Sequence, residues 1–302
     1  YKLLYYKLDA VVVYQAEEES TSDIFLRLQE GIPLNSAEKL NAMRGIVRNK
    51  VVQISQQPFW QSLGIGNYRF GHRYICAQIV SLELSNINLP ESGIHITDVK
   101  FPALQRNYQL YKTVEPPQKV LDQVNETLNF LTKALEIRGQ MIKQKGDVIP
   151  IYLLASYLLR RYASVKQQGD KFKNFVEEFL TKVYSYEGGH YFNYRYARST
   201  ATESRKSIGK GFDVILGKFL EFAPELQPKD EKRVFDYGQK LAIYFRDQGK
   251  CQGQGCGRAL NFDEGEFHHV KPWHQGGQTN VENGLLLCSQ CHAKQPKFSE
   301  GT

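Results

Sequence analysis

Long apolar segments are absent from this 302-residue chain. A helix needs about eighteen or more consecutive apolar residues to cross a bilayer, and no stretch of the chain reaches that length. The opening residues also lack the charged, then apolar, then small-residue order of a secretory signal. We therefore expect a cytoplasmic protein with no membrane partner. Because the chain begins at Tyr1, within an alternating strand-like pattern, we also expect that an upstream portion is missing.

Cysteine is scarce, and its distribution is uneven. Four of the five cysteines lie between residues 251 and 292, a stretch that also holds four of the seven histidines. In a cytosolic chain thiols stay reduced, so paired cysteines more often bind zinc than form disulfides. The isolated Cys76 is expected to be a buried apolar side chain.

The overall composition is that of a globular protein, with 41% hydrophobic and 24% charged residues. Its length allows two domains and a sizeable core. The net charge of +7 favours a polyanionic partner, because lysine and arginine side chains placed on phosphates release condensed counterions. A net charge of this size supports a nucleic-acid partner only if a chemical site in the chain indicates the same partner.

The amino-terminal part mixes strand and helix patterns. Residues 3–13 alternate like a strand, and residues 21–23 offer a cap for a helix that ends at Gly31. A second helix is expected, with Asn35 or Ser36 as its cap and Glu38 near its first turn, and it should run to about Arg44. Residues 50–115 are turn-rich, and the segments SGIHITDV and NYRFGHRYICAQIV can be strands or short helices.

The middle of the chain has a helical pattern. After the boundary at residues 115–117, apolar residues recur every three or four positions from Val120 to Leu135. Similar patterns predict helices over residues 151–162 and 172–183, and a shorter one over residues 212–222.

Residues 190–211, between two of these helices, combine aromatic and basic side chains. Aromatic rings beside cations can stack on bases and hold phosphates, which predicts contact with nucleic acid. The alternative is a helix junction with a solvated basic face. The candidate contacts in this segment are Arg195, Arg198, Arg205 and Lys206.

The last seventy residues carry the densest set of metal-ligand side chains. A predicted helix over residues 235–248 leads into a C-x4-C pair, and a C-x2-C pair follows about thirty residues later. Two such pairs on tight turns can converge on one tetrahedral zinc, with no position left for substrate. We therefore expect a structural zinc site made by Cys251, Cys256, Cys288 and Cys291.

Catalysis would then fall to the histidines. His268 and His269 end a predicted strand, where alternation directs neighbouring side chains to opposite faces. His292 follows the last cysteine, where a short helix could bring its ring back to the His268 strand. A metal ion held by two imidazoles keeps positions open for water and a phosphate oxygen.

The run HHVKPW, the following GG, Asn283 before LLLC, and CSQCH together resemble the HNH (ββα-metal) endonuclease motif in its zinc-knuckle form. The resemblance implies that His269 is the general base and that His268 and His292 hold the catalytic ion. It also implies that Asn283 bridges the loop and orients His269. The first cysteine pair departs from the family pattern, with four intervening residues where two are usual.

The same resemblance implies metal-dependent hydrolysis of DNA to 5′-phosphate and 3′-hydroxyl ends. Magnesium or manganese is the expected catalytic ion, although two imidazoles also suit nickel or zinc. Lys271 and His274, in the loop after the strand, are further candidate phosphate contacts, and an ordinary loop position is the alternative for His274. Two other functions remain open: a zinc-finger DNA-binding regulator that does not cut, and a homing or mobile-element nuclease.

Residues 23–43, DIFLRLQEGIPLNSAEKLNAM, resemble part of the ParB-like amino-terminal domain of GmrSD-type modification-dependent restriction proteins. Gln29 replaces the usual asparagine, and the upstream D-G-Q-Q-R motif, associated with nucleotide hydrolysis, does not occur in the chain. The resemblance implies restriction of modified or phage DNA, with a possible nucleotide at this domain; oligomeric assembly is left open.

These features predict an α+β fold in three parts. A mixed ParB-like domain covers residues 1–115, a helical region covers residues 116–229, and a zinc-knuckle ββα module with the nuclease residues covers residues 230–302.

Overall fold

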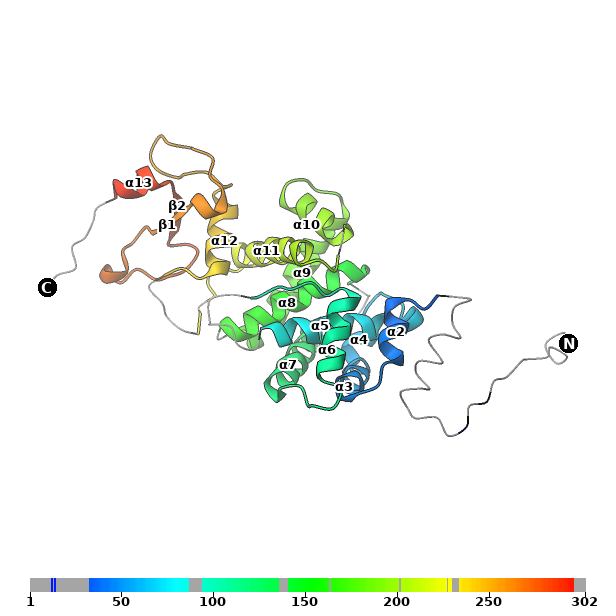
Figure 1. Cartoon of the computed structure of the whole chain (residues 1–302). Coiled ribbons are helices and arrows are strands. Elements are labelled where there is room, and N and C mark those ends of the chain that lie inside the picture. Colours follow the sequence, from blue (N-terminus) through cyan, green and yellow to red (C-terminus); the bar gives the residue numbers. More distant parts are fainter. Residues whose placement is uncertain are drawn as a thin grey trace.

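The computed structural model describes Val12, Tyr14 and residues 33–86, 94–135, 141–162, 164–200, 202–226, 228–229 and 234–295. Helices make up most of this part, and a small two-stranded sheet lies near its carboxyl-terminal end (Figure 1). The strand predicted over residues 3–13 and the helix predicted to end at Gly31 fall outside the described residues, apart from Val12.

Described residues between 33 and 115 form helices and no strand. Asn35, one of the two caps that the sequence allows, caps the first of them, and its side chain and that of Glu38 form the reciprocal bonds of a capping box. The helices here are α2 (Ser36–Ala42), α3 (Ile46–Ile54), α4 (Pro58–Gln61), the 3₁₀ turn η3 (Tyr68–Phe70), α5 (Gly71–Ser85) and α6 (Phe101–Leu110). Of the two segments that the sequence left between strands and short helices, NYRFGHRYICAQIV lies mostly in the fifteen-residue helix α5, and the described residues of SGIHITDV, 94–99, form neither a helix nor a strand.

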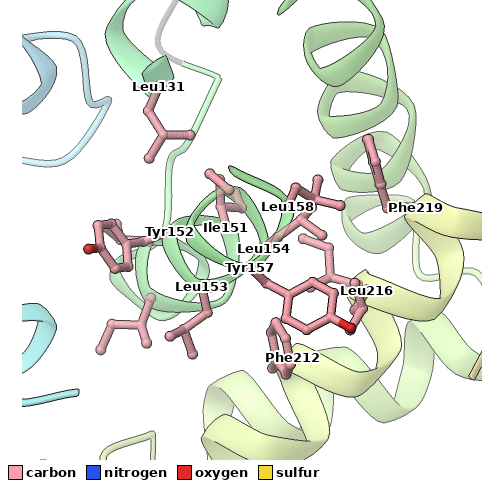
Figure 2. Packing of buried hydrophobic residues seen from close by; sticks show 14 of the residues in the cluster. Leu131, Ile151, Tyr152, Leu153, Leu154, Tyr157, Leu158, Phe212, Leu216 and Phe219 are labelled. Carbon is pink, nitrogen blue, oxygen red and sulfur yellow. The ribbon is translucent and has the colours of Figure 1, made fainter. Parts of the chain in front are cut away.

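The predicted helical middle is confirmed. Its elements are α7 (Gln118–Ala134), α8 (Lys145–Arg161), the 3₁₀ turn η4 (Val165–Gln167), α9 (Gly169–Tyr184), α10 (His190–Ser199) and α11 (Arg205–Phe222). Helix α8 is the centre of the packing: Ile151, Leu154 and Leu158 are fully buried, between Leu131 of α7 and Phe219 of α11 (Figure 2).

Two sequence expectations about the segment from 190 to 222 are wrong. Residues 190–211 are not a junction throughout, because they include all of α10 and the first turns of α11. Helix α11 also begins at Arg205, about two turns before the predicted start, with Ser204 as its side-chain cap. Basic and aromatic residues hid the helical pattern, since two of the aromatic side chains, Phe192 and Tyr196, are exposed.

Helix α12 (Tyr237–Arg246) joins the helical body to the carboxyl-terminal module and packs along α11. Gly217 and Gly238 permit this approach. A methyl group at Gly217 would overlap the ring of Phe245, and one at Gly238 would lie 2.6 Å from Leu220 Cδ1. Polar bonds strengthen the contact, because Tyr237 donates to Asp213 of α11 at 2.9 Å.

The carboxyl-terminal module consists of the antiparallel strands β1 (Glu266–His269) and β2 (Gly284–Leu287) and the short helix α13 (Ser289–Ala293). Its other regular elements are the 3₁₀ turns η5 (Phe262–Glu264) and η6 (Trp273–Gln275). Gly284 lies against α12, where any side chain would overlap Ile243. Arg246 donates to the carbonyl oxygens of Val281 and Gly284, both at 2.7 Å, so the end of α12 holds the start of β2.

A single cluster of buried apolar residues extends from α2 through the helical body to β2 and to Cys251 and Cys288, the first cysteine of each pair. Cys76 lies within it and is fully buried, as expected. Among the described helices, none is both long and apolar enough to span a bilayer.

Candidate functional site

The four carboxyl-terminal cysteines converge as the sequence predicts. One sulfur atom from each of Cys251, Cys256, Cys288 and Cys291 lies within 4.8 Å of all the others. A tetrahedral zinc with Zn–S bonds of about 2.3 Å needs sulfur atoms about 3.8 Å apart. The wider first pair, C-x4-C, therefore does not prevent the four thiols from fitting one metal ion.

Backbone N–H groups point at the cysteine sulfurs. Cys288 N lies 3.2 Å from Cys251 Sγ, and Cys291 N lies 3.4 Å from Cys288 Sγ. The N–H of Cys291 and the neighbouring thiols lower the pKa of Cys288 to about 7, which favours the thiolate that a metal requires. Gly253 must lack a side chain, because a Cβ there would lie 2.6 Å from Cys291 Sγ.

His268 and His292 face each other across the module. His268 lies on β1, where it pairs with Leu285 of β2, and His292 lies on α13. The ring centroids of the two histidines are 5.3 Å apart, and the ring planes meet at 77°. A cation bound at about 2.1 Å to one nitrogen of each ring would hold the centroids roughly 5 Å apart. Partial burial and the neighbouring His292 lower the pKa of His268, which favours the neutral ring.

His269 has different neighbours. Its ring stacks on Phe235, with centroids 4.2 Å apart and planes 20° from parallel. Its Nε2 lies 3.0 Å from the hydroxyl of Thr279, which is itself buried. The two adjacent histidines of β1 therefore have different surroundings, as the alternation of side chains along a strand predicts.

Asn283 bridges the two ends of the loop between the strands. Its side-chain oxygen accepts from Lys271 N at 2.7 Å, and its amide nitrogen donates to the carbonyl oxygens of Lys271 and Gln278. These bonds close the loop immediately after His269. A polar contact to the His269 ring itself comes from Thr279, so Asn283 acts on the backbone beside the histidine.

The basic residues predicted to contact nucleic acid differ from one another. Arg198 forms an ion pair with the buried Asp147 at 2.8 Å, and only 14% of its side chain is exposed, so it faces the interior. Arg195 donates to the carbonyl oxygens of Val183 and Glu187 and lies over the ring of Tyr186. Three of the remaining candidates, Arg205, Lys206 and Lys271, are exposed. The side chain of His274 lies outside the described part of the chain.

Three residues near the histidines were not identified from the sequence: Phe235, Gln239 and Thr279. Gln239 donates from Nε2 to the carbonyl oxygen of Thr279 at 2.7 Å and is almost fully buried. A signal for Gln239 exists in the sequence, because Asp236 stands three residues before it in the order of a capping box. Nothing in the sequence connects Thr279 to His269.

Comparison with known proteins supports the assignment of this module. Residues 251–297 match the family model described as HNH endonuclease, and these residues contain all four cysteines, the three histidines and Asn283 discussed above. No curated protein and no solved structure matches the chain. At its carboxyl-terminal end, the chain therefore carries a domain of the HNH endonuclease family, which indicates a metal-dependent nuclease with a DNA substrate.

Proposed function

We propose that this module is a DNA endonuclease that hydrolyses phosphodiester bonds with His269 as the general base. The observation that supports the proposal best is the separation of the two adjacent histidines. His268 faces His292, whereas His269 lies against Phe235 and Thr279. A hydrolytic site needs a pair of ligands for an ion and, beside it, a proton acceptor with its own support.

His268 and His292 are the side chains that would hold the catalytic ion. We propose magnesium or manganese, whose remaining ligands would be the oxygen atoms of water and phosphate; imidazole ligands by themselves favour nickel or zinc. When bound, the ion supplies positive charge that stabilises the phosphate oxygens as negative charge develops on them. The four-cysteine cluster offers a separate, closed site whose zinc would stabilise the fold.

The protein's own part in the reaction is proton transfer and orientation. His269 takes the proton from the attacking water, and its ring becomes an imidazolium cation. The face of Phe235 lies against this ring and stabilises the cation by a cation–π interaction. Asn283 holds the backbone that follows His269, which limits the orientations of the strand end.

The test is the change His269→Ala in a plasmid-cutting assay with magnesium or manganese. We expect the cutting rate to fall by about 100-fold or more, since general base catalysis contributes about that much. His95→Ala, at an exposed histidine far along the chain, is the matched control. If a folded, zinc-containing His269→Ala protein cuts at close to the normal rate, the assignment is wrong.

The same assay separates the alternative functions. DNA binding without cutting, under every metal tested, would support a zinc-finger regulator instead. Cutting at one long sequence, without dependence on modification or nucleotide, would support a homing or mobile-element nuclease.

We propose that DNA follows exposed cations on the module and at the start of α11. Lys271 lies in the loop that Asn283 closes, and Arg205 and Lys206 start α11, the helix on which α12 packs. The exposed rings of Phe192 and Tyr196 on α10 stack at 6.5 Å and offer a platform for bases. Arg198 does not belong to this surface, because its guanidinium is paired with Asp147.

A restriction role against modified or phage DNA is the finer proposal. It is supported by the resemblance of residues 23–43 and by a pocket of about 320 Å³ that is lined by α2, α5, α8, α10 and α11. Lys145 lines this pocket and would suit an anionic ligand such as a nucleotide, whereas the guanidinium of Arg69, which also lines it, is paired with Glu38. Cutting that depends on added nucleotide or on modified bases supports this role, and equal cutting of unmodified DNA without nucleotide contradicts it.

A further inference from the structure

Two successive hydrogen bonds connect α12 to the ring of His269. Gln239 on α12 donates from Nε2 to the carbonyl oxygen of Thr279 at 2.7 Å. The hydroxyl of the same threonine lies 3.0 Å from His269 Nε2. Gln239 is 2% exposed and Thr279 is 8% exposed, so water competes little for these bonds.

The amide of Gln239 has a fixed orientation. Its Oε1 accepts from Asp236 N at 2.9 Å, and the Asp236 carboxylate accepts from Gln239 N at 2.8 Å. One end of the amide therefore caps α12 and the other end holds Thr279. A flip of the amide would place a donor against the Asp236 N–H and an acceptor against the Thr279 carbonyl, and both bonds would be lost.

The cap of α12 is anchored to the helical body. Tyr162, which follows α8 and is 1% exposed, donates to the Asp236 carboxylate at 3.1 Å. The backbone N–H of Gly238 points at the hydroxyl of Tyr157 on α8 at 3.4 Å. The first turn of α12 is thus held by α8 on one side and reaches the His269 ring on the other.

The contact with Thr279 has a chemical consequence for His269. When Nε2–H donates to the hydroxyl of Thr279, the basic lone pair of the neutral ring is on Nδ1. Uptake of a proton at Nδ1 leaves the Nε2–H bond unchanged. The ring then needs no rearrangement during proton transfer, which is the advantage of a preorganised site.

We propose that Thr279 and Gln239 are positioning residues that hold His269 as its Nε2–H tautomer, with Nδ1 as the atom that accepts the proton from water. Through the cap of α12, the helical body sets the orientation of the base. This inference rests on the proposed role of His269 as general base, and its test includes a measurement that needs no activity.

The test uses Thr279→Val, which keeps the branched shape and removes the hydroxyl, and Thr279→Ser, which keeps the hydroxyl. Thr132→Val is the matched control, because the Thr132 hydroxyl bonds locally, to Leu128 O on α7, away from the module. Nitrogen-15 NMR of the imidazoles in the full, zinc-loaded chain reports the tautomer, and the His269 signal is identified by its loss in His269→Ala.

In the unchanged protein we expect the Nε2–H tautomer at His269. Thr279→Val should give a mixture of tautomers, a fall in kcat of about tenfold or more, and a KM for DNA within about twofold of normal. Thr279→Ser should restore both the tautomer and kcat. A change in KM alone would indicate a structural effect and would overturn the proposal.

Gln239→Glu tests the second bond. Glutamate keeps the acceptor that caps α12, but its carboxylate offers no donor to the Thr279 carbonyl. We expect the helix content to stay unchanged and kcat to fall as in Thr279→Val. Wild-type kcat together with an unchanged His269 tautomer, in either Gln239→Glu or Thr279→Val, would overturn the inference.

The two proposals fail in different ways. If the His269→Ala protein cuts normally, the general-base role is wrong whatever the NMR spectrum shows. If the His269→Ala protein is inactive but the tautomer is Nδ1–H or insensitive to Thr279, the base role stands and the positioning role is wrong.

Discussion

Asp213 on α11 is a carboxyl group in an unfavourable place. It accepts a hydrogen bond from Tyr237 at 2.9 Å, yet desolvation outweighs this bond and raises its pKa to about 6. A carboxyl group whose pKa is higher in the folded chain binds protons more tightly there than when unfolded. Its stabilising contribution is therefore complete below about pH 4 and is lost as the pH rises through about 6.

This shift predicts that Asp213→Asn stabilises the protein at neutral and alkaline pH. Asparagine keeps the oxygen that accepts from Tyr237 and carries no charge to desolvate. A shift of about two pKa units corresponds to up to about 3 kcal/mol in the free energy of unfolding at pH 8. Denaturant unfolding from pH 5 to pH 8 measures the difference, which should shrink toward acid pH. An unchanged or lower stability at pH 8 would show that the carboxylate is better solvated than its position suggests.

Among the elements, helices with one apolar face could be predicted from the sequence and the others could not. Helices α7 and α9 bury a single stripe, for example Val124, Leu128 and Leu131, and the three-to-four spacing is visible in the chain. Helix α5 is buried on most sides from Ile75 to Glu83, so it has no polar face to reveal its period. Exposed aromatic rings hid α10 in the same way.

The candidate site was predictable where its chemistry is local. The cysteine pairs, the adjacent histidines and the asparagine stand at spacings that tight turns and one hairpin bring together. The support of His269 was not predictable, because Gln239 lies forty positions before Thr279 and meets it only through the packing of α12. That packing depends on Gly284, whose missing side chain leaves room for Ile243.

The four-cysteine cluster predicts that the module depends on zinc while the helical body does not. Its sulfur atoms come from the loop after α12 and from the start of α13, two segments that a bound metal ion would join. We expect about one zinc ion per chain, and Cys288→Ser should remove it, unfold the module and abolish cutting. Zinc content by mass spectrometry of the intact protein, with circular dichroism for the helices, measures this. A Cys288→Ser protein that keeps its zinc would contradict the prediction, and Cys76→Ser is the control for loss of a thiol.

For the whole molecule, the shared core matters because it fixes the cutting module to the helical body. Apolar packing is continuous from α2 to β2, and the most extensive contact between helices is that of α11 with α12. Cations at the start of α11 therefore keep a constant position relative to His269. A DNA duplex held by those cations would meet the module in one orientation, which is a requirement for cutting at a defined place.

This arrangement predicts that Arg205 and Lys206 contribute to DNA affinity through phosphates. The double change Arg205→Glu and Lys206→Glu should weaken binding, most strongly at low salt. It should also reduce the slope of log K against log salt by about one for each phosphate that the protein no longer neutralises. Binding measured by fluorescence anisotropy over a salt series decides this, with catalytically inactive His269→Ala protein to keep the DNA intact.

The control for net charge is the double change Arg106→Glu and Lys133→Glu, at two exposed cations on α6 and α7. Both double changes alter the formal charge of the chain by the same amount, so a difference between them reports position rather than total charge. We expect the control to bind DNA almost as well as the unchanged protein, because the proposed path follows α11 and neither Arg106 nor Lys133 lies on that helix. If both pairs weaken binding equally, only the total charge matters and DNA does not follow the start of α11.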